Sequence, residues 1–250
     1  MSISIKSPRE IELMRISNHL ICDMHRELEK LIRPGISTMD LDDAAAKFLA
    51  HHGVVSNFLN YDGFPANICV SVNDEVVHGI PSADRILKEG DIVSIDAGCI
   101  YKGYHSDAAR THIVGKASPE VQKLVDETRN AFFEAIKVAR VGNRVFDISN
   151  AVADYISQFG YGIVRELVGH GVGTALHEDP QIPNYHMDRR GPKLQAGMTL
   201  AVEPMIALGR GDVVGEEDEW TVVTEDGSPA AHYENTILIT DGDPEILSLY

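Results

Sequence analysis

The stretch LKEGDIVSID at residues 87–96 is matched further along the chain by LQAGMTLAVE at residues 194–203. Leucine aligns with leucine, glycine aligns with glycine, and a carboxylate, Asp96 or Glu203, ends each stretch. In both, a glycine turn precedes a mainly apolar run, which is typical of a strand. The match indicates two structural halves that share one plan.

The same offset holds upstream of these stretches. Gly35 falls on Gly142, and Asp40 falls on Asp147. Ser7-Pro8 resembles Ser118-Pro119 at an offset that is larger by about one helical turn of 3.6 residues. We therefore expect one domain over residues 1–250, with halves at about 7–114 and 118–240, each holding two helices followed by strands.

The local pattern places these elements. A cap, a proline and a capping-box glutamate at residues 7–10 predict a helix that starts at Pro8 and is stopped by Pro34-Gly35. Further helices are expected at 39–51, 119–138 and 145–159. Strands are expected where β-branched residues gather between turn formers, at 68–72, 92–97, 104–114, 164–168, 199–205 and 233–240. These elements predict an α/β fold in which the strands form a shared sheet and the helices lie outside it.

The composition is that of an acidic chain with enough apolar residues for a core. Of its 250 residues 44% are hydrophobic, and the net charge is −16. Because nucleic-acid binding needs a basic surface, no direct nucleic-acid partner is expected. No segment is apolar for long enough to be a signal sequence or a membrane span, so no membrane partner is expected. Cys22, Cys69 and Cys99 are scattered and odd in number, which favours reduced thiols and a cytoplasmic location.

Two aspartates stand where strands disfavour them. Asp96 ends the apolar run at 92–95, and Asp107 follows the strand segment after the Lys102-Gly103 turn. A simple hairpin would place the two roughly opposite each other, and such facing anions are destabilising unless a cation lies between them. The alternative for either residue is an exposed or hydrogen-bonded place in a turn.

The second half supplies a matching pair of carboxylates and an imidazole. Glu203 interrupts an apolar strand, Glu234 lies beside another, and each alone is typical of a solvated face. His170 lies in the glycine-rich segment 169–173, where a ligand can approach the backbone closely. Four carboxylates and one imidazole suit two adjacent divalent ions about 3.5–4 Å apart. Such oxygen-rich ligands favour Mn, Fe or Co, with Zn as the alternative.

In order and spacing these five residues resemble, one by one, the metal ligands of type I methionine aminopeptidases. The resemblance covers essentially the whole chain and is closest to the minimal bacterial form. Further segments that match are YDGFP at 61–65, SVNDE at 71–75, HGIP at 78–81, GHGVG at 169–173, HEDP at 177–180 and VEPM at 202–205. The resemblance implies the pita-bread α/β fold, a pseudo-twofold pair of halves around a central curved antiparallel sheet.

It also implies a reaction, the removal of the N-terminal methionine from a nascent protein whose second residue is small. A hydroxide held between the two ions would attack the first peptide bond, since a bound metal can lower the pKa of water to about 7. Glu203 would take up a proton while also binding metal. His177 would stabilise the carbonyl oxygen, and His78 would contact the scissile amide. The alternative for each histidine is a strand-end or loop residue without chemistry.

The resemblance assigns the methionine pocket to Tyr61, Phe64, Cys69 and Trp220, each of which could instead be plain core. Two neighbouring positions depart from the family pattern and leave the pocket's shape open. Phe58 stands where some members have cysteine, and Leu176 stands where an aromatic residue is often found.

The remaining implications concern partners. We expect a monomer that acts on the N-terminal methionine of nascent peptides, with the ribosome as a candidate docking partner and a monovalent cation near Asn73. One alternative is an X-Pro aminopeptidase or dipeptidase of the same fold, although such enzymes usually carry an additional N-terminal domain. The other is a non-catalytic binding module, although relatives of that kind lose metal ligands.

Overall fold

Helices and a layer of short antiparallel strands make up residues 3–249, the part of the chain that the computed structural model describes. Residues 1, 2 and 250, at the ends of the expected domain, lie outside it. The α-helices are α1 (Pro8–Glu29), α2 (Thr38–His52), α3 (Pro119–Ile136) and α4 (Val145–Ile156), and a short 3₁₀ turn, η1, spans Tyr61–Gly63.

The helices confirm the sequence prediction at their starts. Ser7 accepts a hydrogen bond from the Glu10 N–H and the Glu10 carboxylate accepts one from Ser7, so the capping box is closed. Gly53 ends α2 at a φ of 65°, a left-handed conformation that glycine adopts without strain. The ends are less well predicted, because α1 stops at Glu29, before Pro34-Gly35.

The strands fall into two sets. Those of the first half are β1 (Val55–Ser56), β2 (Cys69–Val72), β3 (Glu75–Val77), β4 (Ile92–Ala97), β5 (Cys99–Tyr101), β6 (Tyr104–His105) and β7 (Ala108–Ile113). Those of the second half are β8 (Gly162–Ile163), β9 (Gly169–Gly171), β10 (Glu178–Ile182), β11 (Thr199–Val202), β12 (Met205–Ala207), β13 (Val213–Gly215), β14 (Val222–Thr224), β15 (Ala230–His232), β16 (Asn235–Leu238) and β17 (Glu245–Ile246).

In the first half, one hairpin is broken in the middle. Strand β4 lies between β2 and β7, and the hairpin continues in the same register through β5 and β6 to the Lys102-Gly103 turn. Both turn residues have positive φ, as the tightest hairpins require. This register pairs Asp96 with Ala109. The prediction that Asp96 and Asp107 lie opposite each other is therefore wrong: Asp107 lies two residues nearer the turn, on the diagonal.

The second half repeats this arrangement. Strand β11 lies between β9 and β16, and its hairpin continues in one register through β12 and β15. The break falls at Glu203-Pro204, where proline has no N–H to donate, so the expected strand 199–205 is two strands. The strand expected at 164–168 is wrong, because Arg165 and Glu166 are exposed and the pairing lies on either side, in β8 and β9.

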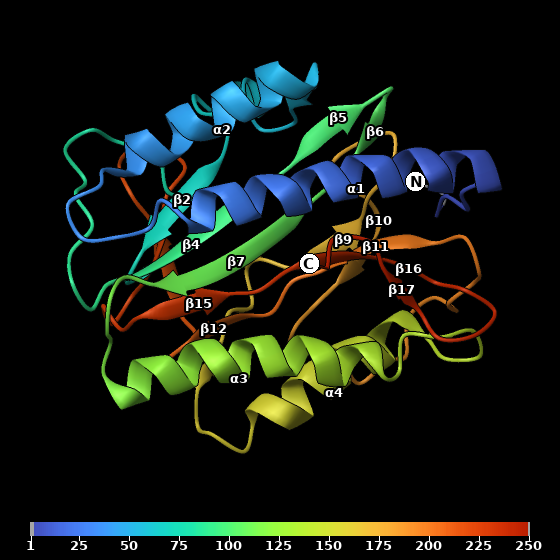
Figure 1. The fold of residues 1–250 in the computed structure, drawn as a ribbon. Coiled ribbons are helices and arrows are strands. Elements are labelled where there is room, and N and C mark those ends of the chain that lie inside the picture. The colour runs from blue at the N-terminus through green and yellow to red at the C-terminus, as the bar shows by residue number, and fades with distance from the viewer. Residues whose placement is uncertain (1–2, 250) are drawn as a thin grey trace.

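The two hairpins meet at a single backbone pair. Ala109 and Glu234 exchange N–H···O bonds of 3.4 and 2.9 Å. In Figure 1, α1 and α2 lie over the strands of the first half, α3 and α4 lie over those of the second, and β7 runs between α1 and α3. Each helix pair covers a large apolar cluster, one drawn from residues 20–114 and the other mainly from 121–246. The strand face turned away from the helices is left to form the site.

Candidate metal centre

A cavity of about 280 Å³ opens among the strands, and none of the residues that line it belongs to α1–α4. Each of the site residues proposed from the sequence lines it: Tyr61, Phe64, Cys69, His78, Asp96, Asp107, His170, His177, Glu203, Trp220 and Glu234. Segments from 58 to 234 thus meet in one place, with ionisable groups and apolar side chains sharing the same space.

Three of the four carboxylates lie at breaks of the two hairpins, and the fourth, Asp96, lies within a strand near one of them. Asp107 precedes β7, Glu203 follows β11, and Glu234 precedes β16, while Asp96 lies within β4 beside Gly98. Where the strand pairing is interrupted, the carboxylate side chains point into the cavity. The interruptions that made the observed strands shorter than predicted therefore supply residues of the site.

These carboxylates are strongly desolvated. Burial raises the pKa of Asp96 to about 7. Burial, reinforced by the charges of neighbouring carboxylates, raises the pKa values of Asp107, Glu203 and Glu234 well above their ordinary range. Oxygens of Asp96, Asp107 and Glu234 are buried with no hydrogen-bond partner among the described residues. Buried acceptors of this kind are costly unless a cation or a proton satisfies them.

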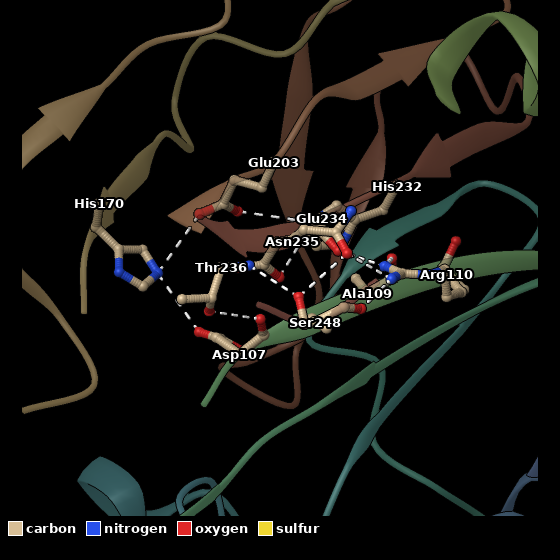
Figure 2. A network of polar contacts seen from close by, with 12 residues as sticks. Asp107, Ala109, Arg110, His170, Glu203, His232, Glu234, Asn235, Thr236 and Ser248 are labelled. Atoms are coloured by element: carbon tan, nitrogen blue, oxygen red, sulfur yellow. Dashed lines mark hydrogen bonds and ion pairs between the residues drawn. The ribbon is translucent and has the colours of Figure 1, made fainter. Parts of the chain in front are cut away.

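His170 points one ring nitrogen at this group (Figure 2). Its Nδ1 lies 2.8 Å from the Gly171 carbonyl, which leaves Nε2 facing Asp107 Oδ2 and Glu203 Oε1, each at 3.5 Å. An imidazole that donates one N–H to a backbone carbonyl and offers the other nitrogen is the usual form of a metal-binding histidine. Burial lowers the pKa of His170 to about 3, so the ring is neutral and its Nε2 lone pair is available.

The donor set fits divalent cations. One donor atom each from Asp107, His170 and Glu234 lie within 4.8 Å of one another, which is the spacing of ligands around a common ion. Glu203 and Asp96 extend the group into a site rich in carboxylate oxygens, with one imidazole. Bound cations would satisfy the unpartnered oxygens and offset the repulsion between the carboxylates.

Two further histidines, His78 and His177, line the cavity. The His177 ring packs edge-on against His170 with centroids 4.4 Å apart, and its Nδ1 lies 2.8 Å from the Tyr61 hydroxyl. The loop that carries His177 is held by Glu178, which accepts from the Thr174 backbone and pairs with Lys6 at 2.5 Å. Burial lowers the pKa values of both His78 and His177, so both are neutral near pH 7.

The rest of the cavity wall is apolar. Phe58, Phe64, Ala66, Cys69 and Leu176 form a buried cluster, against which Ile80 and Trp220 pack. The rings of Phe64 and Trp220 meet edge to face at 5.2 Å. Burial raises the pKa of the Cys69 thiol well above its usual value, so this cysteine acts as a small apolar residue. Phe58 and Leu176, the two positions that depart from the family pattern, both belong to this cluster, one with a larger side chain than cysteine and the other with a smaller one than an aromatic residue.

The geometry agrees with comparisons to known proteins. A sequence model described as metallopeptidase family M24 matches residues 12–241. The chain belongs to metallopeptidase family M24. Within it, the chain is 50% identical to a methionine aminopeptidase of Clostridium acetobutylicum, over 99% of each protein.

Solved structures of M24 proteins place the fold. The crystal structure of a methionine aminopeptidase from Thermotoga maritima covers 100% of both chains with a TM-score of 0.98 and 44% identity. A prolidase from Pyrococcus furiosus, at 22% identity and a TM-score of 0.80, shares the fold alone, and the chain covers 65% of it. These matches confirm the predicted pita-bread α/β fold. Membership of a metallopeptidase family agrees with the buried Asp/His/Glu group, which is compatible with metal binding. Among residues 3–249, no helix is both long and apolar enough to cross a bilayer.

Two polar residues at this M24 site escaped the sequence analysis. His232 lines the cavity with its Nε2 3.7 Å from Glu203 Oε2, and Arg110 is buried beneath it. Arg110 donates to the Glu234 carbonyl, to Asn235 Oδ1 at 2.6 Å and to the Ser248 carbonyl at 2.8 Å. The missed signal was strand periodicity, because His232 stands two residues before Glu234 and such residues share a face.

Proposed function

We propose that this chain is a methionine aminopeptidase, which hydrolyses the first peptide bond of chains whose second residue is small. The supporting observation is the cavity, in which a buried donor group for divalent ions adjoins an apolar pocket. Whole-length similarity to methionine aminopeptidases supports the same activity.

Asp96, Asp107, His170, Glu203 and Glu234 would hold two divalent ions, with Mn, Fe or Co as the favoured metals and Zn as the alternative. When bound, the ions supply Lewis acidity toward the substrate carbonyl and a reactive water near neutral pH. The monovalent cation expected near Asn73 stays a prediction. The Asn73 carbonyl accepts the Ala230 N–H at 2.8 Å and keeps one lone pair for it.

Glu203 is the proposed proton acceptor. Its carboxylate is only 12% exposed and lies between His170 and His232. Without metal, burial raises its pKa, and bound cations would lower it again, because a neighbouring positive charge favours the ionised carboxylate that can accept a proton. A base at this place takes the proton of the attacking water as the new carbon–oxygen bond forms.

His177 is the proposed donor to the carbonyl oxygen. Its neutral ring carries one N–H, and the Tyr61 hydroxyl at 2.8 Å can donate to Nδ1 and so keep that hydrogen on Nε2. Such a donor acts most strongly when the oxygen becomes negative in the transition state. His78, across the cavity beside Trp220, is the proposed contact of the scissile amide.

The apolar cluster is the proposed methionine pocket. Tyr61, Phe64, Cys69 and Trp220 offer an aromatic and sulfur lining, and a thioether packs well against aromatic rings. Phe58 fills space that cysteine would leave open, and Leu176 leaves open space that an aromatic ring would fill, so these two residues change the shape of the pocket.

The setting of the activity is also proposed. We expect a monomer that works in the cytoplasm on chains leaving the ribosome. Light scattering tests the first expectation, and co-sedimentation with ribosomes tests docking.

The activity is tested by removing the metal. The protein is stripped with chelator, Mn²⁺, Fe²⁺, Co²⁺ or Zn²⁺ is restored singly, and the peptides Met-Ala-Ser, Met-Lys-Ser and an X-Pro peptide are assayed. We expect cleavage of Met-Ala-Ser alone, and only with metal. Activity without metal, equal cleavage of all three peptides, or preference for the X-Pro peptide would contradict the proposal.

A further inference from the structure

His232 is a buried imidazole that the reaction described above does not use. It ends β15, its side chain is 2% exposed, and its ring lines the metal cavity. Neither ring nitrogen has a hydrogen-bond partner among residues 3–249. Because a buried N–H without an acceptor is costly, a histidine at this position needs a hydrogen-bond acceptor for its ring N–H.

The backbone of His232 is fixed, so the ring cannot turn away by moving the strand. Its N–H donates to Thr111 Oγ1 at 2.8 Å, and its carbonyl accepts from the same hydroxyl at 2.9 Å. Both hydrogen bonds join β15 to β7, the strand on which the two halves meet. The side chain therefore stays in the cavity wall.

The acceptors within reach are two glutamates. Nε2 lies 3.7 Å from Glu203 Oε2 and 3.9 Å from Glu234 Oε2. The two oxygens of Glu203 are thus divided, since Oε1 faces His170 and Oε2 faces His232 (Figure 2). The terminal torsion of glutamate is soft, so a small rotation brings Oε2 within hydrogen-bond distance of Nε2.

A role for His232 as an additional metal ligand fits less well. His232 lies outside the group of donor atoms within 4.8 Å of one another, from Asp107, His170 and Glu234, as Asp96 and Glu203 also do. Its other nitrogen, Nδ1, is also unlike that of His170, which is committed to a backbone carbonyl. His232 in addition borders a second, polar cavity that Arg110 and Thr111 line.

We infer that His232 is a positioning residue, whose Nε2–H bonds to Glu203 Oε2 and leaves Oε1 directed toward His170 and the ions. The inference rests on the proposed function, in which Glu203 both binds metal and accepts a proton. A carboxylate with two such tasks needs a fixed orientation, and groups that orient a metal-binding residue typically affect affinity or activity by about 10–100-fold. His232 itself touches neither substrate nor ion.

Two matched variants test this role. In His232→Gln the amide nitrogen takes the place of Nε2 and still reaches Glu203. In His232→Asn it takes the place of Nδ1 and falls short, although both variants keep a polar amide in the strand. We expect His232→Asn to lower kcat about 10–100-fold with KM little changed, and His232→Gln to retain most of the activity.

Metal binding supplies a readout that does not depend on turnover. Titration of metal-free protein with Mn²⁺ by calorimetry should show affinity about tenfold weaker in His232→Asn and near that of the parent in His232→Gln. Melting temperatures of the metal-free proteins serve as the control for folding. Equal losses in both variants, an Asn variant like the parent, or losses that follow the melting temperature would overturn the inference.

The two proposals fail separately. If the parent protein does not cleave Met-Ala-Ser, the proposed function fails, while the order of Mn²⁺ affinities among the three proteins still decides the role of His232.

Discussion

The two broken hairpins share a backbone plan but place different side chains on it. In the second half, Glu203 and Glu234 lie directly across the break of one ladder. In the first half, Asp96 lies opposite Ala109, and the second carboxylate, Asp107, comes two residues earlier. Ala109 therefore stands where Glu234 does in the other half, and these two residues bond to each other.

The strands beside the hairpins differ in the same way. His170 pairs with Ala201 on β11, and by the same plan Ser71 pairs with Ser94 on β4. The Ser71 hydroxyl, however, accepts the Gly79 N–H at 3.0 Å and offers nothing to the cavity. The halves thus share a scaffold, while the imidazole and the longer carboxylates come from one of them. The comparison teaches that backbone symmetry does not require symmetric chemistry.

The largest expected difference between the halves is in turnover. Asp96 and Glu203 are equivalent positions, yet only Glu203 is the proposed base. Glu203→Gln should lower kcat by about 10³-fold or more, within the range for loss of a general base. Asp96→Asn should lower activity less, and excess Mn²⁺ should restore part of it, because that variant mainly loses metal affinity.

Steady-state kinetics over a range of Mn²⁺ concentrations measure both variants. If excess Mn²⁺ restored the activity of both variants to the same extent, Asp96 and Glu203 would have equivalent roles, which would contradict the difference proposed between the halves.

The sequence was most informative where a predicted strand contained or adjoined a residue type that strands disfavour. Asp96, Glu203 and Glu234 could be predicted as site residues because a carboxylate next to a buried apolar strand is costly unless a partner satisfies it. His232 was not predicted because a histidine between Ala231 and Tyr233 is not an unusual residue in a strand. The pairing of β3 with β14 joins distant segments, and local pattern does not encode such pairings.

The next difference concerns stability and pH. An acid whose pKa is higher in the folded state binds more protons when folded, so stability falls as pH rises between the unfolded and folded pKa values. For Asp96 that window runs from about 4 in the unfolded chain to about 7 in the folded protein. Metal-free protein should therefore melt at lower temperature as pH rises through this window.

Bound metal should reverse the trend. At about 100 times its Kd, Mn²⁺ adds about 2.7 kcal/mol, or roughly 5–10 °C in a domain of this size. We expect this gain in Tm to grow from pH 5.5 to 7.5, as measured by calorimetry. Asp107→Asn and Glu234→Gln, one from each half, should both flatten the metal-free curve. A gain independent of pH would argue against buried carboxylates as the ligands.

The smallest difference lies at the second helix of each half. Ser37 caps α2 by accepting the Asp40 N–H at 3.1 Å, whereas Arg144 at the start of α4 bonds to Asp147 through its backbone N–H at 2.8 Å and directs its guanidinium to the Gly191 carbonyl at 2.7 Å. Ser37→Ala should cost about 1 kcal/mol, and Arg144→Lys, which removes no cap and keeps a cationic donor near Gly191, about 0.5 kcal/mol or less. Urea unfolding measures both; equal costs would mean that the two helix starts are equivalent after all.

Trp220 gives the cavity a built-in optical reporter. The chain contains one tryptophan, and its indole lies in the pocket wall, 5.2 Å from Phe64 and 6.4 Å from His78. The ultraviolet emission excited at long wavelength therefore originates at a single point in the wall of the proposed methionine pocket. Unlabelled peptides that differ only in their first residue can be ranked by quenching at equilibrium, before any bond is cut.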